Sequence, residues 1–115
     1  MLDSSTLTAA SALQLDHTVV PDEQRAGGQP STGYATLGEF NGSEIGVWEM
    51  TPGAMTDVEA DEVFIVLAGA ASVDFTGTGE SITLAPGDVG RLRAGQQTLW
   101  TVTETLRKIY ITATD

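Results

Sequence analysis

The residues best suited to chemistry are four carboxylates within six positions, Asp57, Glu59, Asp61 and Glu62. Carboxylate oxygens are the ligands that a hard cation prefers, so the group invites comparison with a cation site. In an extended chain, however, the three odd-numbered side chains point one way and Glu62 points the other. Asp57, Glu59 and Asp61 are therefore predicted to form a solvated face. Glu62 begins an apolar run and is predicted to face the protein interior.

A buried carboxylate at Glu62 needs a cation or hydrogen-bond donors to offset the loss of water. Two interpretations stay open, a ligand-binding or cation-binding group and a structurally satisfied carboxylate. Arg107 and Lys108 are adjacent, so strand alternation places them on opposite faces and turns one of them inward. An inward cation would pair with Glu49 or Glu62, or would bind a carboxylate ligand. A structural pair is the favoured interpretation.

Other chemistries have weaker support. The chain has no cysteine, which excludes disulfides and thiolate metal sites and suits a reducing cytoplasm. Its one histidine, His17, has no nucleophile motif nearby, so triad hydrolysis is unsupported. The glycine-containing segment 76–79 precedes a predicted strand and is a turn, whereas a phosphate-binding loop opens a helix.

The charge balance limits the partners of this protein. Sixteen acidic residues against five basic ones give a formal charge of −11. Such a field repels nucleic acid and anionic lipid, so neither is expected as a partner. No Lys or Arg precedes Arg25, and no segment has the character of a signal peptide or a membrane span. A cytoplasmic location is expected.

The elements that position these residues are predicted to be short β-strands. Asn41-Gly42 lies between two strand-like runs and favours a tight hairpin turn. Turn residues recur about every 8–12 positions, and no sustained helical period is present, which indicates a sandwich or barrel. The chain is long enough for one domain, with an extension and loop over 1–33 and a barrel over 34–115. The expected strands cover 13–20, 34–40, 43–50, 62–68, 71–75, 80–84, 89–92, 97–103 and 106–112.

Several of these residues resemble the motifs of the cupin superfamily. Glu62 and Gly69 have the spacing of the end of the first cupin motif, and Gly87 and Gly95 match the glycines of the second. The resemblance implies an all-β fold, the double-stranded β-helix or jelly-roll barrel, with a pocket at one end. The chain is most similar to the ureidoglycine aminohydrolase-like cupins, a family that includes an ethanolamine-utilisation cupin. The segments that carry this likeness are 46–53, 61–62, 66–69, 86–88, 100–102 and 107–110.

The metal-ligating positions of the family are not kept in this chain. Metal-binding cupins have histidines six and four residues before the glutamate, and here those positions are Thr56 and Val58. Thr98 takes the place of the third histidine. Transition metals prefer imidazole, carboxylate or thiolate ligands, so this set predicts neither a metal nor another cofactor.

The resulting hypothesis is a metal-free barrel that binds a small, partly apolar molecule, and no catalytic activity is identified for it. One alternative is a metal-dependent enzyme of the family, of the amidohydrolase or acyl-phosphate transferase type. Another is a scaffold that acts by dimerising, and a homodimer involving the residues before Tyr34 is expected in any case. The candidate pocket residues are Trp48, Met50, Thr56, Val58, Glu62, Phe64, Thr98, Trp100 and Lys108.

Overall fold

The computed structural model describes residues 2–114, and within them the chain is entirely β-structure and turns. The all-β prediction is therefore confirmed. No helix that is long and apolar enough to cross a membrane occurs in this part of the chain. The strands are β1 His17–Val19, β2 Arg25–Gly27, β3 Ser31–Phe40, β4 Ser43–Met50, β5 Gly53–Val58, β6 Glu62–Phe75, β7 Glu80–Leu84, β8 Val89–Leu92 and β9 Gln97–Ala113.

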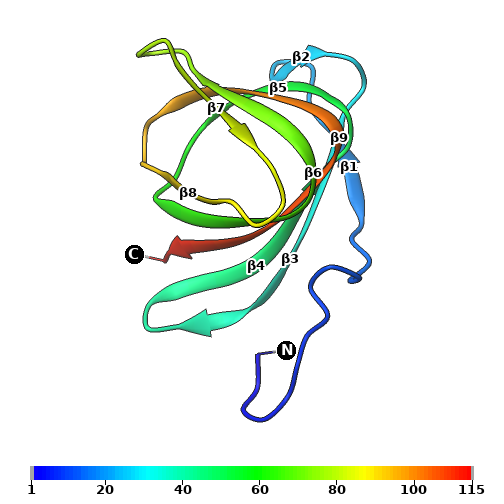
Figure 1. The fold of residues 1–115 in the computed structure, drawn as a ribbon, viewed down its shortest axis with the longest axis vertical. Helices are drawn as coiled ribbons and strands as arrows, with labels where there is room; N and C mark the ends of the chain where they lie inside the picture. Colours follow the sequence, from blue (N-terminus) through cyan, green and yellow to red (C-terminus); the bar gives the residue numbers. More distant parts are fainter. Residues whose placement is uncertain (1, 115) are drawn as a thin grey trace.

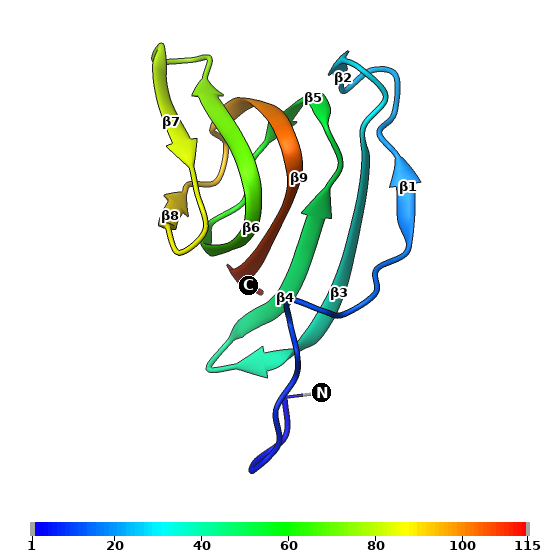
Figure 2. The ribbon, with the colours of Figure 1, turned by 45° about the vertical axis from the view of Figure 1, so that its right-hand side comes forward.

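The strands form one curled antiparallel sheet. Its main order is β1-β3-β4-β9-β5-β2, and β6 pairs with β7, β8 and β9. Figure 1 shows β5 to β9 arranged as a ring, with the β3–β4 hairpin extending from it. In Figure 2, β1, β3 and β4 lie on one side of the molecule and β7 and β8 on the other. The barrel interior lies between them.

The hairpin between β3 and β4 forms at the predicted turn. Asn41 and Gly42 have φ values of 50° and 76°, the positive angles that a tight hairpin turn requires. The two strands then pair from Phe40 with Ser43 onward, but the register shifts between Thr36 and Gly38. This bulge places Tyr34 opposite Trp48.

The strands β6 and β9 are longer than predicted. The sequence predicts a break at Gly69 and another near residue 104, whereas each strand continues through its break. Gly69 has φ 95°, and a side chain there would overlap the backbone of Thr105 and Leu106. The glycine thus permits a bulged, close crossing of two paired strands, where the sequence suggests a chain reversal. The register shifts around Ala68 and Ala70 mark the same bend.

The N-terminal segment adds two short strands to the sheet. β1 covers only His17–Val19 of the strand expected over 13–20, and it pairs with β3. The loop expected after Pro21 contains β2, because Arg25 pairs with Met55 of β5. Strand β3 also begins before the expected start of the barrel, at Ser31. The extension is therefore joined to the barrel by strand pairing.

The hydrophobic core fills the barrel. Phe64, Leu92 and Leu106 are fully buried, and the core cluster extends to Trp100. Burial of such side chains contributes roughly 1.5–3 kcal/mol each. Gly90 of β8 lies beneath the ring of Phe64, where any side chain would overlap the ring. This packed core supports one wall of the cavity described next.

Candidate functional site

A cavity of about 170 Å³ opens on the inner face of the barrel. Apolar cavities of roughly 150 Å³ accept a molecule as large as benzene, so this one has room for a small ligand. Strands β3, β4 and β9 bring Tyr34, Trp48 and Lys108 into one cross-strand row along it. The complete lining is Tyr34, Trp48, Asp57, Glu59, Glu62, Trp100, Lys108, Tyr110 and Thr112.

Lys108 provides the one positive charge among the lining residues, and it is ion-paired. Its Nζ lies 2.6 Å from Oε2 of Glu62, with 6% of the lysine side chain and 15% of the glutamate side chain exposed. The ammonium also lies 4.7–4.9 Å from the ring centroids of Trp48, Phe64 and Trp100. Cation–π attraction to three rings therefore adds to the ion pair. In the structure, Glu62 is thus a carboxylate paired with a cation of the chain itself.

Asp57 and Glu59 line the same cavity as Glu62. Oε2 of Glu59 accepts hydrogen bonds from the hydroxyl of Thr98 at 2.6 Å and from Nε1 of Trp100 at 2.9 Å. Burial raises the pKa of Asp57, and the negative charge of Glu59 raises it further. Two carboxylates and their donors are thus held at one wall of the cavity.

The prediction of a solvated face for Asp57 and Glu59 is therefore wrong. Strand β5 ends at Val58, so the alternation that governs Asp57 does not continue to Glu62. The chain turns there, and both neighbouring acids face the cavity. Only Asp61 stays outside, where it accepts hydrogen bonds from Arg91 and from the Ala94 backbone.

The structure separates the sequence-predicted pocket residues into two groups. Trp48, Glu62, Trp100 and Lys108 line the cavity. The other five do not. Met50 is core, Phe64 lies against Lys108 from within the core, and Thr98 is buried and bonded to Glu59. Thr56 and Val58 are exposed at a surface hollow that Asp57 and Thr98 also border.

Thr56 and Val58 are absent from the cavity for a geometric reason. In β5, Met55 is buried and Asp57 points to the cavity, so alternation turns the two even-numbered side chains outward. The alignment with the family's histidine positions is consequently one residue out of step with the side chains that face inward. Asp57 and Glu59, five and three residues before Glu62, are the ones that point in.

Tyr110 completes the wall next to β4. Its hydroxyl donates a hydrogen bond of 2.7 Å to Oε2 of Glu44. Burial and this carboxylate raise the pKa of Tyr110 to about 12, so the phenol stays protonated at neutral pH. Gly46 makes room for the ring, because a side chain at that position would overlap it.

Five lining residues are not among the predicted pocket residues: Tyr34, Asp57, Glu59, Tyr110 and Thr112. An unbulged hairpin at Asn41-Gly42 would place Ala35 opposite Trp48, so the bulge alone brings Tyr34 to the cavity. Tyr110 and Thr112 share the alternation of Lys108 and were detectable from it.

The donor set does not fit a transition metal. Within residues 2–114, no group of three His, Cys, Asp or Glu side chains is placed to hold an ion. The ammonium of Lys108 instead provides a positive charge at 2.6 Å from the carboxylate of Glu62. The ligand position of the cupin motif is thus engaged by a lysine.

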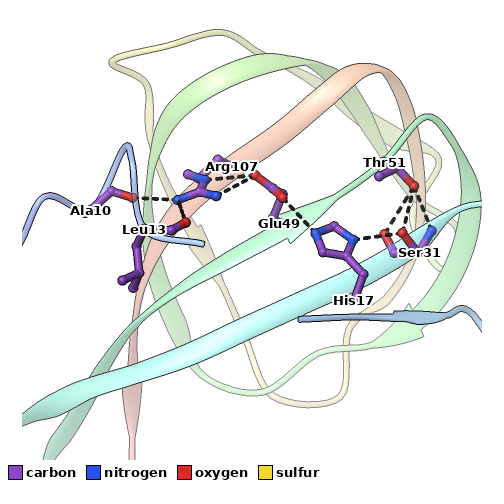
Figure 3. A network of polar contacts seen from close by, with 7 residues as sticks. All are labelled: Ala10, Leu13, His17, Ser31, Glu49, Thr51 and Arg107. Atoms are coloured by element: carbon purple, nitrogen blue, oxygen red, sulfur yellow. Dashed lines mark hydrogen bonds and ion pairs between the residues drawn. The ribbon is translucent and has the colours of Figure 1, made fainter. Parts of the chain in front are cut away.

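A second polar network lies on the other face of the sheet, with Glu49 at its centre (Figure 3). Glu49 accepts hydrogen bonds from Nε and Nη2 of Arg107 and lies 2.7 Å from Nε2 of His17. Nη1 of Arg107 also donates to the carbonyls of Ala10 and Leu13. The network fastens the N-terminal segment to the barrel.

Comparison with known proteins gives the family. The model of the EutQ-like cupin domain matches residues 37–110. No curated protein gives a significant match. Several solved structures are similar in fold over most of this chain. A cupin superfamily protein from Desulfitobacterium hafniense has a TM-score of 0.65 at 17% identity, with 98% of this chain and 94% of that chain covered.

Two further structures agree. The EutQ protein of Clostridium difficile has a TM-score of 0.63 at 19% identity, covering 75% of this chain and 71% of that chain. A Pseudomonas syringae protein of unknown function has a TM-score of 0.74 at 22% identity, covering 89% of this chain but 45% of that chain. The predicted cupin fold is therefore confirmed. The chain has a cupin β-barrel and belongs to the EutQ-like cupin domain family.

Proposed function

We propose that this protein binds a small, partly apolar molecule in the cavity lined by Trp48 and Trp100. The observation that carries the proposal is the composition of that cavity. It combines aromatic walls with a few convergent polar groups, the combination typical of small-molecule sites. Its charged centre, Lys108 and Glu62, is already neutralised at 2.6 Å. A ligand therefore does not have to compensate the charge of Lys108 or that of Glu62.

The cavity also favours binding over the metal-dependent catalysis considered as an alternative. The three-histidine set is missing, and Lys108 bonds the one carboxylate that keeps the family's ligand position. The finer resemblance to ureidoglycine aminohydrolase-like cupins stays a prediction. Its enzymatic chemistry has no matching donor set in residues 2–114.

Intrinsic fluorescence offers a selective test. The chain has two tryptophans, and both line the cavity, so a molecule that enters it changes the whole tryptophan signal. Titration with benzylamine, benzyl alcohol and benzoate supplies three probes of one shape. We expect at least one to give a saturable change. The absence of saturation by all three would contradict the proposal.

A matched pair of variants locates the binding. Thr112→Phe places a ring at the cavity, whereas Thr103→Phe places the same ring on an exposed part of the same strand. Each threonine donates a hydrogen bond to a backbone carbonyl, of Asp61 and Ala70 respectively, so the two substitutions lose similar bonds. Binding should be lost in Thr112→Phe and kept in Thr103→Phe. Equal binding by the two variants would place the ligand elsewhere.

A homodimer also stays a proposal. Residues before Tyr34 already pair with their own barrel through β1 and β2, and they leave Val19 of β1 62% exposed. We expect light scattering to give the mass of two chains, and a monomer at micromolar concentration would contradict it.

A further inference from the structure

The charges around the cavity are unbalanced. Its lining has three carboxylates, Asp57, Glu59 and Glu62, and one ammonium, Lys108, which gives a formal charge of −2. The whole chain has a formal charge of −11, so the surrounding field has the same sign. A walled, partly desolvated site of this sign concentrates cations and repels anions.

Lys108 does not provide an anion site. Its Nζ is 2.6 Å from the carboxylate of Glu62 and is surrounded by three aromatic rings. A carboxylate or phosphate ligand would have to share the ammonium with Glu62, inside a ring of aromatic side chains. It would also have to lie beside Asp57 and Glu59, whose charges repel it.

The two remaining carboxylates are poorly balanced. Among residues 2–114, no cationic side chain bonds to Asp57 or Glu59. Asp57 accepts one hydrogen bond through Oδ1, from the backbone N–H of Val58. Its other oxygen has no donor among the described residues. Glu59 is oriented by Thr98 and Trp100 through Oε2, and its second oxygen likewise accepts no bond from the described chain.

The apolar part of the cavity suits a flat organic body. Trp48 and Trp100 pack at 5.7 Å between ring centroids with an interplanar angle of 55°, so their faces form an angled wall. Tyr34 is 68% exposed while lining the cavity, which places an aromatic surface at its opening. Such rings favour contact with both apolar groups and organic cations.

From these observations we infer that the ligand is a small organic cation, a primary amine or amidine on a flat apolar body. This inference rests on the proposed binding function. The cationic group donates hydrogen bonds to Asp57 and Glu59, and the body lies against Trp48 and Trp100. A bare metal ion is disfavoured because no three ligating side chains converge.

The affinities of the three probes test this inference. Benzylamine should bind at least roughly tenfold more tightly than benzyl alcohol, the margin of one charge-assisted hydrogen bond, and benzoate should bind most weakly. If benzyl alcohol or benzoate binds as tightly as benzylamine, the inference is wrong and the binding function stands. If none of the three binds, the binding function itself fails.

Charge-neutralising variants test the assigned contact. Asp57→Asn keeps an acceptor for the Val58 N–H. It should weaken the affinity for benzylamine by at least roughly tenfold and leave the affinity for benzyl alcohol unchanged. Asp16→Asn, at an exposed position, changes the net charge equally and should leave both affinities unchanged. Unaltered benzylamine affinity in Asp57→Asn would overturn the inference. Should that variant fail to fold, the ranking of the probes on the unmodified protein still decides.

Discussion

Lys108 and Arg107 are neighbours in β9, yet they belong to two different regions of the molecule. On the inner face, Lys108 pairs with Glu62 and borders a cavity. On the outer face, Arg107 pairs with Glu49 and bonds the carbonyls of Ala10 and Leu13. Both cations are buried and both have a carboxylate partner, so burial and pairing alone do not distinguish a site from a structural contact.

What distinguishes the two regions is what surrounds each pair. The outer pair is covered by the chain itself, and Arg107 also donates to the backbone carbonyls of Ala10 and Leu13. The inner pair adjoins empty space and the two carboxylates Asp57 and Glu59. The outer network therefore holds the N-terminal segment in place, whereas the inner one leaves groups available to a ligand.

The largest expected effect comes from the inner pair. Lys108→Met leaves Glu62 buried without a cation, which should lower the free energy of unfolding by about 3 kcal/mol or more. The double variant Lys108→Met with Glu62→Gln should recover most of that loss, because no uncompensated charge remains. Urea denaturation measures both. A loss well below 1 kcal/mol in the single variant would show that Lys108 is not a partner of Glu62.

Replacing the neighbouring Arg107 by Met should lower the free energy of unfolding by a smaller amount. Arg107→Met leaves Glu49 with its bond to His17, so we expect a loss of about 1–2 kcal/mol. Hydrogen exchange should nevertheless rise in residues 10–17, which lose two of their anchors. In Lys108→Met the exchange of this segment should not change selectively. Faster exchange of residues 10–17 in Lys108→Met, without it in Arg107→Met, would show that the inner pair and the N-terminal segment are energetically coupled.

The acid dependence of the two regions should have opposite signs. Burial raises the pKa of Glu49, but its bonds with His17 and Arg107 outweigh this, and the net pKa is lowered. Its contribution to stability is present above the ordinary value and is lost as the pH falls through the lowered pKa. Glu49→Gln should therefore flatten the loss of stability at acid pH.

Asp57 should behave in the opposite way. Burial, together with the charge of Glu59, raises its pKa, so its stabilising contribution is present below the ordinary value and is lost as the pH rises through the raised pKa. Asp57→Asn should gain stability relative to the unmodified protein at neutral pH, while losing affinity for benzylamine. Melting temperatures measured from acid to neutral pH compare the two variants. If Glu49→Gln and Asp57→Asn changed the pH dependence of the melting temperature in the same direction, the opposite pKa shifts of Glu49 and Asp57 would be contradicted.

The sequence predicts the barrel better than the cavity. The hairpin at Asn41-Gly42 and the opposite faces of Arg107 and Lys108 follow from local rules and are found in the structure. The continuous strands β6 and β9 do not follow from such rules, because Gly69 marks a close crossing that depends on a strand far along the chain.

The errors at the cavity have local causes of another kind. Strand alternation does not continue from Asp57 to Glu62 because β5 ends at Val58, and it fails for Tyr34 because a bulge shifts the register of β3. Each of these irregularities offsets the side-chain alternation by one residue, and such an offset turns a side chain from one face of the sheet to the other. Identifying the cavity lining therefore requires the three-dimensional structure.

The central claim, that the inner face receives a ligand and the outer face does not, has a direct test in a ¹H–¹⁵N correlation spectrum. The indole N–H signals of Trp48 and Trp100 report the cavity, and the guanidinium Nε–H of Arg107 reports the outer network. Addition of benzylamine should shift both indole signals in a saturable way and leave the Arg107 signal in place. Indole signals that do not move, or a shift confined to Arg107, would contradict the account.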